Sequence, residues 1–322
     1  MMHKSTFLLA MVFFVLIGHA QDKSKMYYTD TSSGKPIAKD PTVVYFKNAY
    51  WMYYSIANND KKGWSIGIAK SNDLTNWQKA GEINPEETYE KNGLCAPGAY
   101  VENGKINLFF QTYGNGPKDA ICHATSTDGI HFKRNKTNPV FRPTGKWNNG
   151  RAIDAEVIKF KGKYFLYFAT RDPEGKIQMQ GVATAPGNSN FNRGAWTMAA
   201  DKSILYPTLA WERNCVEGAS LVNLGDELYM FYAGSYNNEP QQIGVAKSKD
   251  GITWQRLYNH PFLENGKQGT WNSSESGHPD IFKDNEGNYH LFFQGNNTGD
   301  GNTWYLSKKE IVWKDGFPVL LN

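Results

Sequence analysis

Cysteine is scarce in this chain, and the few that occur are odd in number. The 322 residues include three cysteines, Cys95, Cys122 and Cys215. An odd count leaves at least one thiol unpaired or paired between chains. Two arrangements stay open, a bridge between Cys95 and Cys122 or buried free thiols. A chain of this length can bury a large core, so it does not need a disulfide framework.

A strong excess of either charge is also missing. Lys and Arg number 35 and Asp and Glu number 31, which gives a formal net charge of +4, and the basic residues are scattered along the chain. Such a balance argues against nucleic acid or a membrane surface as a partner and favours a small neutral molecule. Phosphate-binding and dinucleotide glycine motifs, Cys/His metal spacings and a G-x-S-x-G elbow are absent. We therefore expect no required cofactor.

Long apolar runs are confined to the first twenty residues. Lys4 precedes the apolar run 7–17, and the small-x-small sequence 18–20 follows it. This pattern predicts a secretory signal peptide over residues 1–20 and a periplasmic or secreted protein. The run is too short to span a bilayer.

Strand-forming sequence is abundant, and it recurs. Aromatic residues make up 14% of the chain, and they concentrate in short runs such as YWMYYS, YFLYFA and LYMFYA bounded by Gly, Asn and Asp. Five such runs begin 56 to 64 residues apart, at Tyr50, Ile106, Tyr164, Leu228 and Tyr289. A repeat of this period indicates stacked supersecondary units.

The repeat predicts an all-β fold, a five-bladed β-propeller of four-stranded antiparallel blades. We expect one catalytic domain over residues 38–322. The ring must be closed by an outer strand or clasp, and either the N-terminal segment (residues 21–37) or the tail from Phe317 could supply it. Asp73, Asp128 and Asp250 each precede an aromatic residue by four positions, which predicts turns between third and fourth strands.

The first strand of three units carries an acid near its start. Asp40, Asp154 and Glu217 occupy this position, while Ala96 and His278 stand there in the second and fifth units. Equivalent positions of propeller blades converge on the axis, so we expect the three acids to surround one pocket. Glycoside cleavage needs such a set, because one carboxyl protonates the leaving oxygen while another activates water. The alternative is that the acids anchor loops by accepting backbone N–H bonds.

These motifs resemble glycoside hydrolase family 43 and its five-bladed relatives across residues 38–316. The resemblance implies that Asp40 is the general base, that Asp154 raises the pKa of the acid and that Glu217 is the general acid. It also implies that His278 lies in the channel, where a structural calcium would sit nearby. Inversion is implied as well, with base and acid roughly 6.5–9.5 Å apart.

The resemblance implies a substrate from plant or algal polysaccharide, with a terminal α-L-arabinofuranose first, β-D-xylose next and an agar anhydrosugar third. The identity of the sugar stays open, because the sequence departs from the family pattern at three places: Cys95-Ala96-Pro97, Asp154-Ala155 and Glu217-Gly218-Ala219. Two rivals also remain. One is a glycan-binding propeller without turnover, and the other is a phosphorolytic enzyme with a basic phosphate site. We expect a monomer.

Aromatic and basic residues precede the inner strands on the same side as the acids. Trp147, Trp211 and Trp271 lie six or seven residues before Asp154, Glu217 and His278. Each indole could stack on a sugar face or cover its own blade. Arg151 and Arg213 share these loops, where a guanidinium could bind substrate or form a loop salt bridge.

Overall fold

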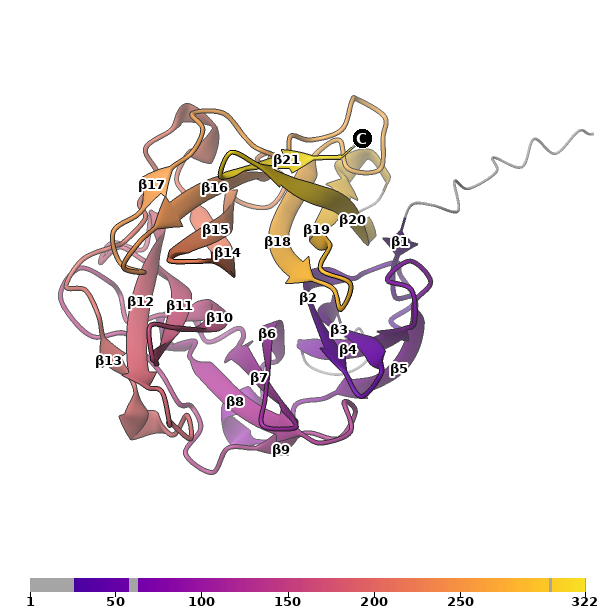
Figure 1. The fold of residues 1–322 in the computed structure, drawn as a ribbon. Helices are drawn as coiled ribbons and strands as arrows, with labels where there is room; N and C mark the ends of the chain where they lie inside the picture. The colour runs from indigo at the N-terminus through magenta and orange to yellow at the C-terminus, as the bar shows by residue number, and fades with distance from the viewer. Residues whose placement is uncertain (1–25, 58–62, 301–302, 322) are drawn as a thin grey trace, which may run out of the picture.

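The chain folds into a ring of five β-sheets around a central axis (Figure 1). The computed structural model describes residues 26–57, 63–300 and 303–321, so the predicted signal peptide lies outside the described residues. All strand pairs named within the five sheets are antiparallel, and the five-bladed propeller predicted from the repeat is confirmed. Among the described residues, no helix is long and apolar enough to cross a bilayer.

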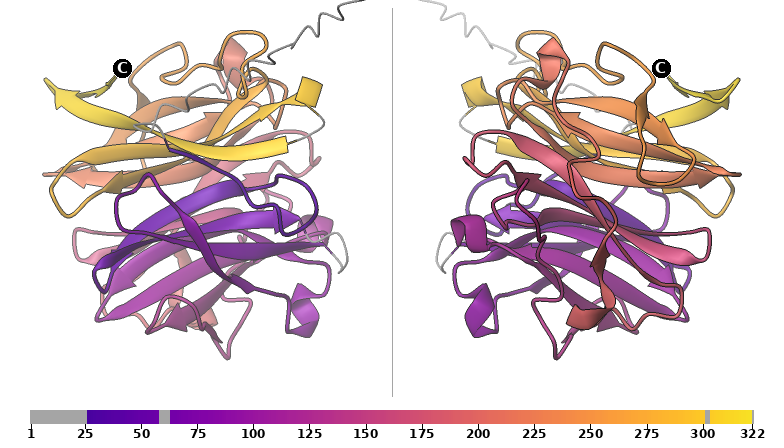
Figure 2. Two further views of the ribbon diagram at one scale, coloured as in Figure 1. Left: turned by 90° about the vertical axis from the view of Figure 1, so that its right-hand side faces the viewer. Right: turned by 90° about the vertical axis from the view of Figure 1, so that its left-hand side faces the viewer.

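Each blade presents its first strand to the axis and its later strands progressively further out (Figures 1 and 2). The inner strands are β2 (Lys39–Phe46), β6 (Leu94–Glu102), β10 (Ile153–Phe160), β14 (Val216–Leu224) and β18 (Glu275–Lys283). The second strands are β3 (Ala49–Ala57), β7 (Lys105–Thr112), β11 (Lys163–Arg171), β15 (Glu227–Gly234) and β19 (Tyr289–Asn297).

The outer strands differ more in length. The third strands are β4 (Trp64–Ser71), β8 (Ile121–Ser126), β12 (Gln178–Pro186), β16 (Gln242–Ser248) and β20 (Thr303–Lys314). The fourth strands of the first four blades are β5 (Gln78–Ile83), β9 (Lys133–Arg134), β13 (Thr197–Met198) and β17 (Gln255–Arg256). Short 3-10 turns lie in the connections: η1 (Thr88–Glu90), η2 (Gly116–Lys118), η3 (Arg193–Ala195), η4 (Ala210–Glu212) and η5 (Thr298–Asp300).

Both ends of the described chain pair with β20. Strand β1 (Tyr27–Tyr28) places Tyr27 opposite Ser307, and β21 (Phe317–Leu320) places Leu320 opposite Ile311. The last blade is thus completed by residues from the start of the chain and extended by residues from its end. Both segments that the sequence suggested for closing the ring contact the same strand.

Apolar side chains fill the spaces between blades. The aromatic residues that follow the turn acids contact the preceding blade, as Trp77 does with Phe292 and Trp254 with Tyr167. The acids close the turns as predicted: the Oδ1 atom of Asp250 accepts the backbone N–H groups two and three residues further on. All three cysteines are buried and free, which agrees with the free-thiol alternative.

A β-bulge interrupts every inner strand at the same level. The register shifts between the first strand and the second, and one residue adopts a positive φ in each blade: Asp40 (51°), Ala96 (45°), Asp154 (53°), Gly218 (58°) and His278 (45°). A bulge re-aims side chains toward new directions. In the fourth blade the bulged residue is Gly218, so Glu217 lies one position before Asp40 and Asp154 in phase.

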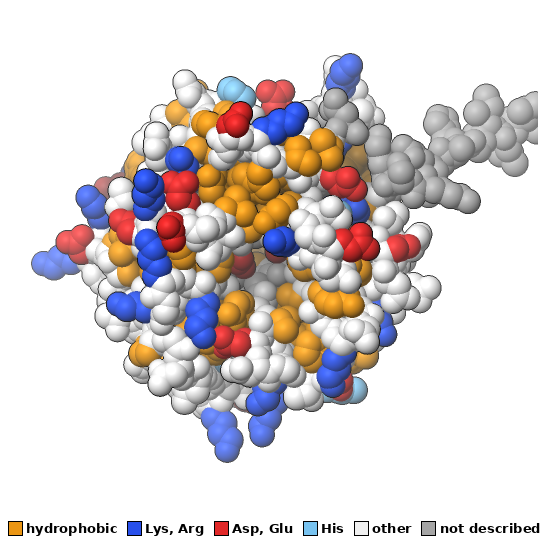
Figure 3. Space-filling model, in the orientation of Figure 1, with side chains coloured by type: hydrophobic (Ala, Val, Ile, Leu, Met, Phe, Trp, Pro, Cys, Tyr) orange, Lys and Arg blue, Asp and Glu red, His pale blue; other side chains and the backbone are white. Residues whose placement is uncertain are grey.

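Two residues beyond the bulge, a ring of inter-blade hydrogen bonds surrounds the axis. Each blade has a belt position two residues after its bulge residue. The backbone N–H of the residue after the belt position donates a hydrogen bond to the belt side chain of the preceding blade. Four such bonds form: Ala99 to Thr42 Oγ1 (3.1 Å), Leu221 to Glu156 Oε1 (3.3 Å), Ile281 to Ser220 Oγ (3.0 Å) and Val43 to Asp280 Oδ2 (3.0 Å). We call these four side chains the belt. Figure 3 shows one face hollowed on the axis.

The fifth position of the ring is Gly98, which has no side chain to accept a bond. A Cβ atom there would lie 1.9 Å from the carbonyl oxygen of Ala155, so the backbones of two blades approach too closely for any other residue. The belt therefore stays open at one link, between the second and third blades.

Burial raises the pKa of Asp280 to about 7, although Val43, Thr42 and Ser220 donate hydrogen bonds that oppose the shift. An acid with a higher pKa in the folded chain binds a proton there between about pH 4 and 7, so the free energy of unfolding falls as the pH rises through this range. Asparagine keeps one acceptor oxygen without the buried charge. We expect Asp280→Asn to raise the free energy of unfolding by roughly 1–3 kcal/mol at pH 8 and by much less at pH 5.

Chemical denaturation at both pH values measures this difference. The exposed Asp226, in the turn after β14, provides a matched control as Asp226→Asn. A destabilisation by Asp280→Asn that is equal at pH 5 and pH 8 would contradict the raised pKa of Asp280.

Candidate active site

One open cavity of about 200 Å³ lies where the inner strands begin. Asp40 of β2, Asp154 of β10, Glu217 of β14 and His278 of β18 all line it. The bulge lets two successive residues of one strand face the cavity, as Lys39 and Asp40 do. The structure thus brings together the four inner-strand residues that the sequence singled out.

Two glutamine side chains hold the carboxylate of Glu217. Gln241 Nε2 donates to Glu217 Oε1 at 2.7 Å, and Gln178 Nε2 donates to Glu217 Oε2. Both glutamines are almost fully buried. Each stands three residues before a third-strand glycine, Gly181 or Gly244, and this shared spacing is a signal in the sequence that could have identified them. Glu217 is therefore held by the first residue of β12 in the preceding blade and by the residue just before β16 in its own blade.

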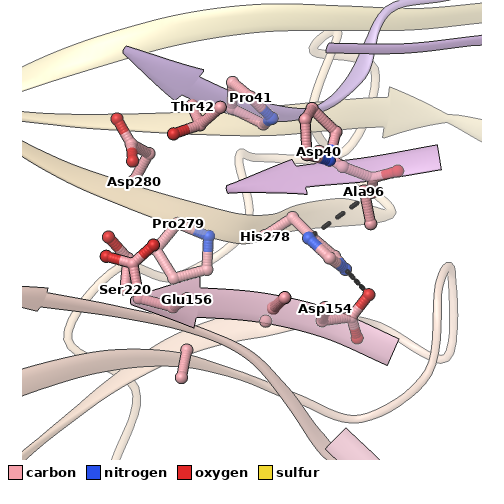
Figure 4. A pocket seen from close by; sticks show the side chains of 14 residues that line it. Asp40, Pro41, Thr42, Ala96, Asp154, Glu156, Ser220, His278, Pro279 and Asp280 are labelled. Atoms are coloured by element: carbon pink, nitrogen blue, oxygen red, sulfur yellow. Dashed lines mark ion pairs between the residues drawn. The ribbon is translucent and has the colours of Figure 1, made fainter. Parts of the chain in front are cut away.

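His278 lies between the carboxylates of two other blades (Figure 4). Its Nδ1 atom is 3.4 Å from Asp40 Oδ1, and its Nε2 atom is 3.8 Å from Asp154 Oδ1. Burial opposes the charge of the imidazole, but Asp40, Asp154 and Glu217 raise the pKa of His278 above its usual value. The imidazole lies between two acids that favour its charged form, with the belt residues further along the channel.

The same contacts move the two aspartates in opposite directions. Burial alone would raise the pKa of Asp40, but the charges of His278 and Lys39 bring it below the usual value. Burial raises the pKa of Asp154 to about 7, assisted by Glu217 and Asp40 and opposed by His278. At neutral pH Asp40 is thus ionised, whereas Asp154 is close to the pH at which it gains or loses its proton.

Backbone contacts hold both aspartates at the cavity wall. The N–H of Asp40 donates to Gln294 Oε1 and that of Asp154 to Gln111 Oε1, each at 2.7 Å. The acceptor in both cases comes from the second strand of the preceding blade. Asp154 Oδ2 is buried and has no hydrogen-bond partner among the described residues.

Ligand atoms of Asp154, Glu217 and His278 lie within 4.8 Å of one another. Calcium takes six to eight oxygen ligands. This group offers two carboxylates and an imidazole whose two nitrogens each face an aspartate, so it fits calcium poorly. The calcium near His278 stays a prediction, and the reaction proposed below does not use it.

Several cavity residues were not anticipated from the sequence. They are Lys39, Arg171 and three aromatic residues, Trp64, Tyr113 and Tyr236. Arg151, which the sequence did suggest, lines the cavity as well. Tyr113 and Tyr236 each follow the end of a second strand by one or two residues. An aromatic residue at that position is a signal that could have been read.

The three tryptophans before the inner strands do not line the acid cavity. Instead their rings cover glycines of their own blades: a Cβ on Gly295 would lie 2.1 Å from Trp271, one on Gly234 2.2 Å from Trp211, and one on Gly181 3.0 Å from Trp147. Arg213 is exposed and lies outside the lining too. The proposed site therefore does not include these four residues.

The fold and the cavity together define a propeller with three carboxylates around a solvent-accessible pocket, a set of groups suited to the cleavage of glycosidic bonds. The sequence profile of Glycosyl hydrolases family 43 matches residues 33–318. The chain belongs to this family.

Individual relatives are distant. The chain is 23% identical over 168 residues to the extracellular endo-alpha-(1->5)-L-arabinanase 1 of Bacillus subtilis, a match that covers 51% of this chain and 50% of that protein. It is 29% identical over 152 residues to sucrose-6-phosphate hydrolase of Zymomonas mobilis, covering 43% of this chain and 29% of the relative. The matches thus span half or less of the length of these curated relatives.

Solved structures share the fold. A thermostable family-43 glycoside hydrolase superposes with a TM-score of 0.70 at 20% identity, covering 92% of this chain and 96% of that one. An endo-1,4-beta-xylanase from Bacteroides thetaiotaomicron gives the same TM-score and identity, covering 88% and 94%.

The packing of Trp271 predicts a structural role. Its ring contacts Phe293 at 5.8 Å and Tyr27 at 5.3 Å between centroids, besides covering Gly295. We expect Trp271→Ala to lower the free energy of unfolding by about 2–4 kcal/mol, because it removes a large side chain from a packed interface. Trp64→Ala, at the cavity, should cost less. Chemical denaturation compares the two, and an unchanged stability of Trp271→Ala would contradict the packing role.

Proposed function

We propose that this protein is a glycosidase that removes a terminal sugar from fragments of plant or algal polysaccharide. The observation that carries the proposal is that Asp40, Asp154 and Glu217 line one cavity open to solvent. Family membership supports the reaction class. We propose α-L-arabinofuranose first and β-D-xylose second as the sugar removed, with an agar anhydrosugar as a further alternative.

The proposed mechanism divides the work between two carboxylates. Glu217, held by Gln178 and Gln241, donates a proton to the leaving oxygen. Asp40 is ionised, because His278 and Lys39 lower its pKa against the effect of burial, and it removes a proton from the attacking water. Attack from the face opposite the leaving group inverts the anomeric centre.

Asp154 has a binding role in this proposal. Its carboxyl lines the cavity and accepts a hydrogen bond from a hydroxyl of the sugar, and its charge interacts with that of Glu217. The aromatic rings of Trp64, Tyr113 and Tyr236 on the cavity wall offer apolar faces for the sugar. We propose that the protein acts as a monomer outside the cytoplasm, either in the periplasm or secreted.

The roles of Glu217 and Asp40 can be separated by the leaving group. Glu217→Gln should lose about 10²–10⁴-fold in kcat/KM on oligosaccharides, whose leaving group needs a proton, and much less on a dinitrophenyl glycoside. Asp40→Asn should lose a similar factor on both substrates, because water still needs a base. Initial rates on arabinofuranosides and xylosides measure both variants, and NMR of the first-formed anomer tests inversion. Equal losses for Glu217→Gln on both substrates would contradict its role as the acid.

The position of His278 predicts a change in pH dependence. Its positive charge lowers the pKa of Asp40, which burial would otherwise raise, so His278→Gln should raise that pKa. A general base is active only when ionised, and the acid limb of the kcat/KM profile should therefore move to higher pH. The profile of the variant measures the shift, and thermal unfolding checks that it is folded. A lower rate with an unmoved acid limb would contradict this electrostatic role.

A further inference from the structure

Three basic side chains line the cavity that holds the acids: Lys39, Arg151 and Arg171. Lys39 and Arg151 contact side chains beside the cavity. Lys39 lies 4.2 Å from the centre of the Trp304 ring and next to Asp40 in sequence. Arg151 Nε is 3.3 Å from Asp119 Oδ2, a carboxylate that is 1% exposed.

Arg171 is a guanidinium that no carboxylate pairs with in the described part of the chain. Its Nε donates to Gln178 Oε1 at 3.1 Å, and its guanidinium lies 5.5 Å from the centre of the Tyr236 ring. No hydrogen bond to a described residue engages its two terminal NH₂ groups. A guanidinium with its terminal donors unoccupied can bind an oxyanion through two parallel hydrogen bonds.

One amide group links both guanidiniums to Glu217. The oxygen of Gln178 accepts from Arg171 Nε and from Arg151 Nη1 at 3.3 Å, while its nitrogen donates to Glu217 Oε2. The basic pair therefore stands one side chain away from the proposed acid. Because that acid protonates the leaving oxygen, the pair lies beside the sugar unit on the leaving side.

Arg151 and Arg171 also line a second, outer cavity. It shares Tyr113 with the acid cavity and extends along Pro117 and Asn149. The two guanidiniums thus mark the boundary between the reaction centre and a groove that leads away from it. An anion at this boundary would meet the basic pair while keeping its distance from Asp40 and Asp154, whose charges would repel it deeper in the cavity.

We propose that Arg171, assisted by Arg151, forms an oxyanion subsite on the leaving side of the bond that is cleaved. Its ligand is the carboxylate or sulfate group of an acidic sugar, so the substrates are acidic rather than neutral oligosaccharides. This inference rests on the proposed glycosidase function. Free inorganic phosphate has the same recognition chemistry, and the experiment separates the two sources.

Binding is measured first, by isothermal titration calorimetry on the full chain. The probes are paired oligosaccharides that differ only in charge: glucuronic-acid-substituted xylo-oligosaccharides, galacturonate-containing pectin fragments and sulfated agar fragments, each with its carboxyl-reduced or desulfated form. We expect at least one acidic member to bind tenfold or more tightly than its neutral form. Equal affinity within every pair would overturn the subsite.

Variants of Arg171 test whether this residue provides the preference. We expect Arg171→Gln to weaken the acidic member by about 10–100-fold, the value of a charge-assisted pair, and to weaken the neutral member much less. Arg171→Lys should recover only part of the loss, because an ammonium group cannot form the bidentate contact. A loss of the same size for both members would show that Arg171 only maintains the cavity.

Turnover of the same pairs separates this inference from the proposed function. Selective binding without cleavage would remove the glycosidase proposal and leave the subsite standing, whereas cleavage without preference for charge would do the reverse. Phosphate is titrated in parallel. Phosphate binding that Arg171→Gln abolishes, together with a phosphate-dependent rate and a sugar phosphate product, would support the oxyanion subsite but replace the acidic-sugar ligand.

Discussion

The site depends on one backbone feature, the bulge that every inner strand carries at the same level. A regular strand turns alternate side chains to opposite faces, so it could give the cavity only every second residue. The bulge places two successive residues at the wall, as with Lys39 and Asp40. Positive φ angles at non-glycine residues cost roughly 1–2 kcal/mol each. Bonds between blades, such as that from the Asp40 N–H to Gln294, offset this cost.

The crowding of acids at the axis determines the electrostatics of the site. Three carboxylates around one cavity repel one another, and their burial is unfavourable. Basic side chains nearby reduce this electrostatic cost. His278 lies between two aspartates, and Lys39 precedes the first of them in the chain. These cations keep Asp40 ionised, while the pKa of Asp154 rises to about 7 under the larger effect of burial. Two aspartates at equivalent bulge positions thereby acquire different protonation behaviour.

The sequence predicted the ring and the four inner-strand residues because both follow from the repeat. Equivalent positions must converge on the axis, and this holds whatever the details of the loops. The same logic left two positions open for the tryptophans, against a sugar or over their own blade, and the structure shows the second. Trp271 precedes His278 by the expected interval, and its ring covers Gly295. The position of the ring depends on a glycine in a neighbouring strand, and the spacing of residues along one segment does not reveal that contact. Gln178 and Arg171 were missed since their contact requires the exact course of the β11–β12 loop.

Burial of an acid on the axis is not by itself a sign of catalysis, and the channel offers an internal comparison. Asp280 is as deeply buried as Asp40 and Asp154 while Glu156 is half-buried, and desolvation raises the pKa of both belt acids. They differ in their partners, since the belt acids accept hydrogen bonds from backbone N–H groups of the next blade and form no ion pair with a described residue. The two belt acids thus accept bonds from peptide N–H groups, whereas Asp40 and Asp154 face the ionisable ring of His278, and one oxygen of Asp154 has no partner among the described residues. The inner strands therefore supply structure and chemistry from positions only two residues apart.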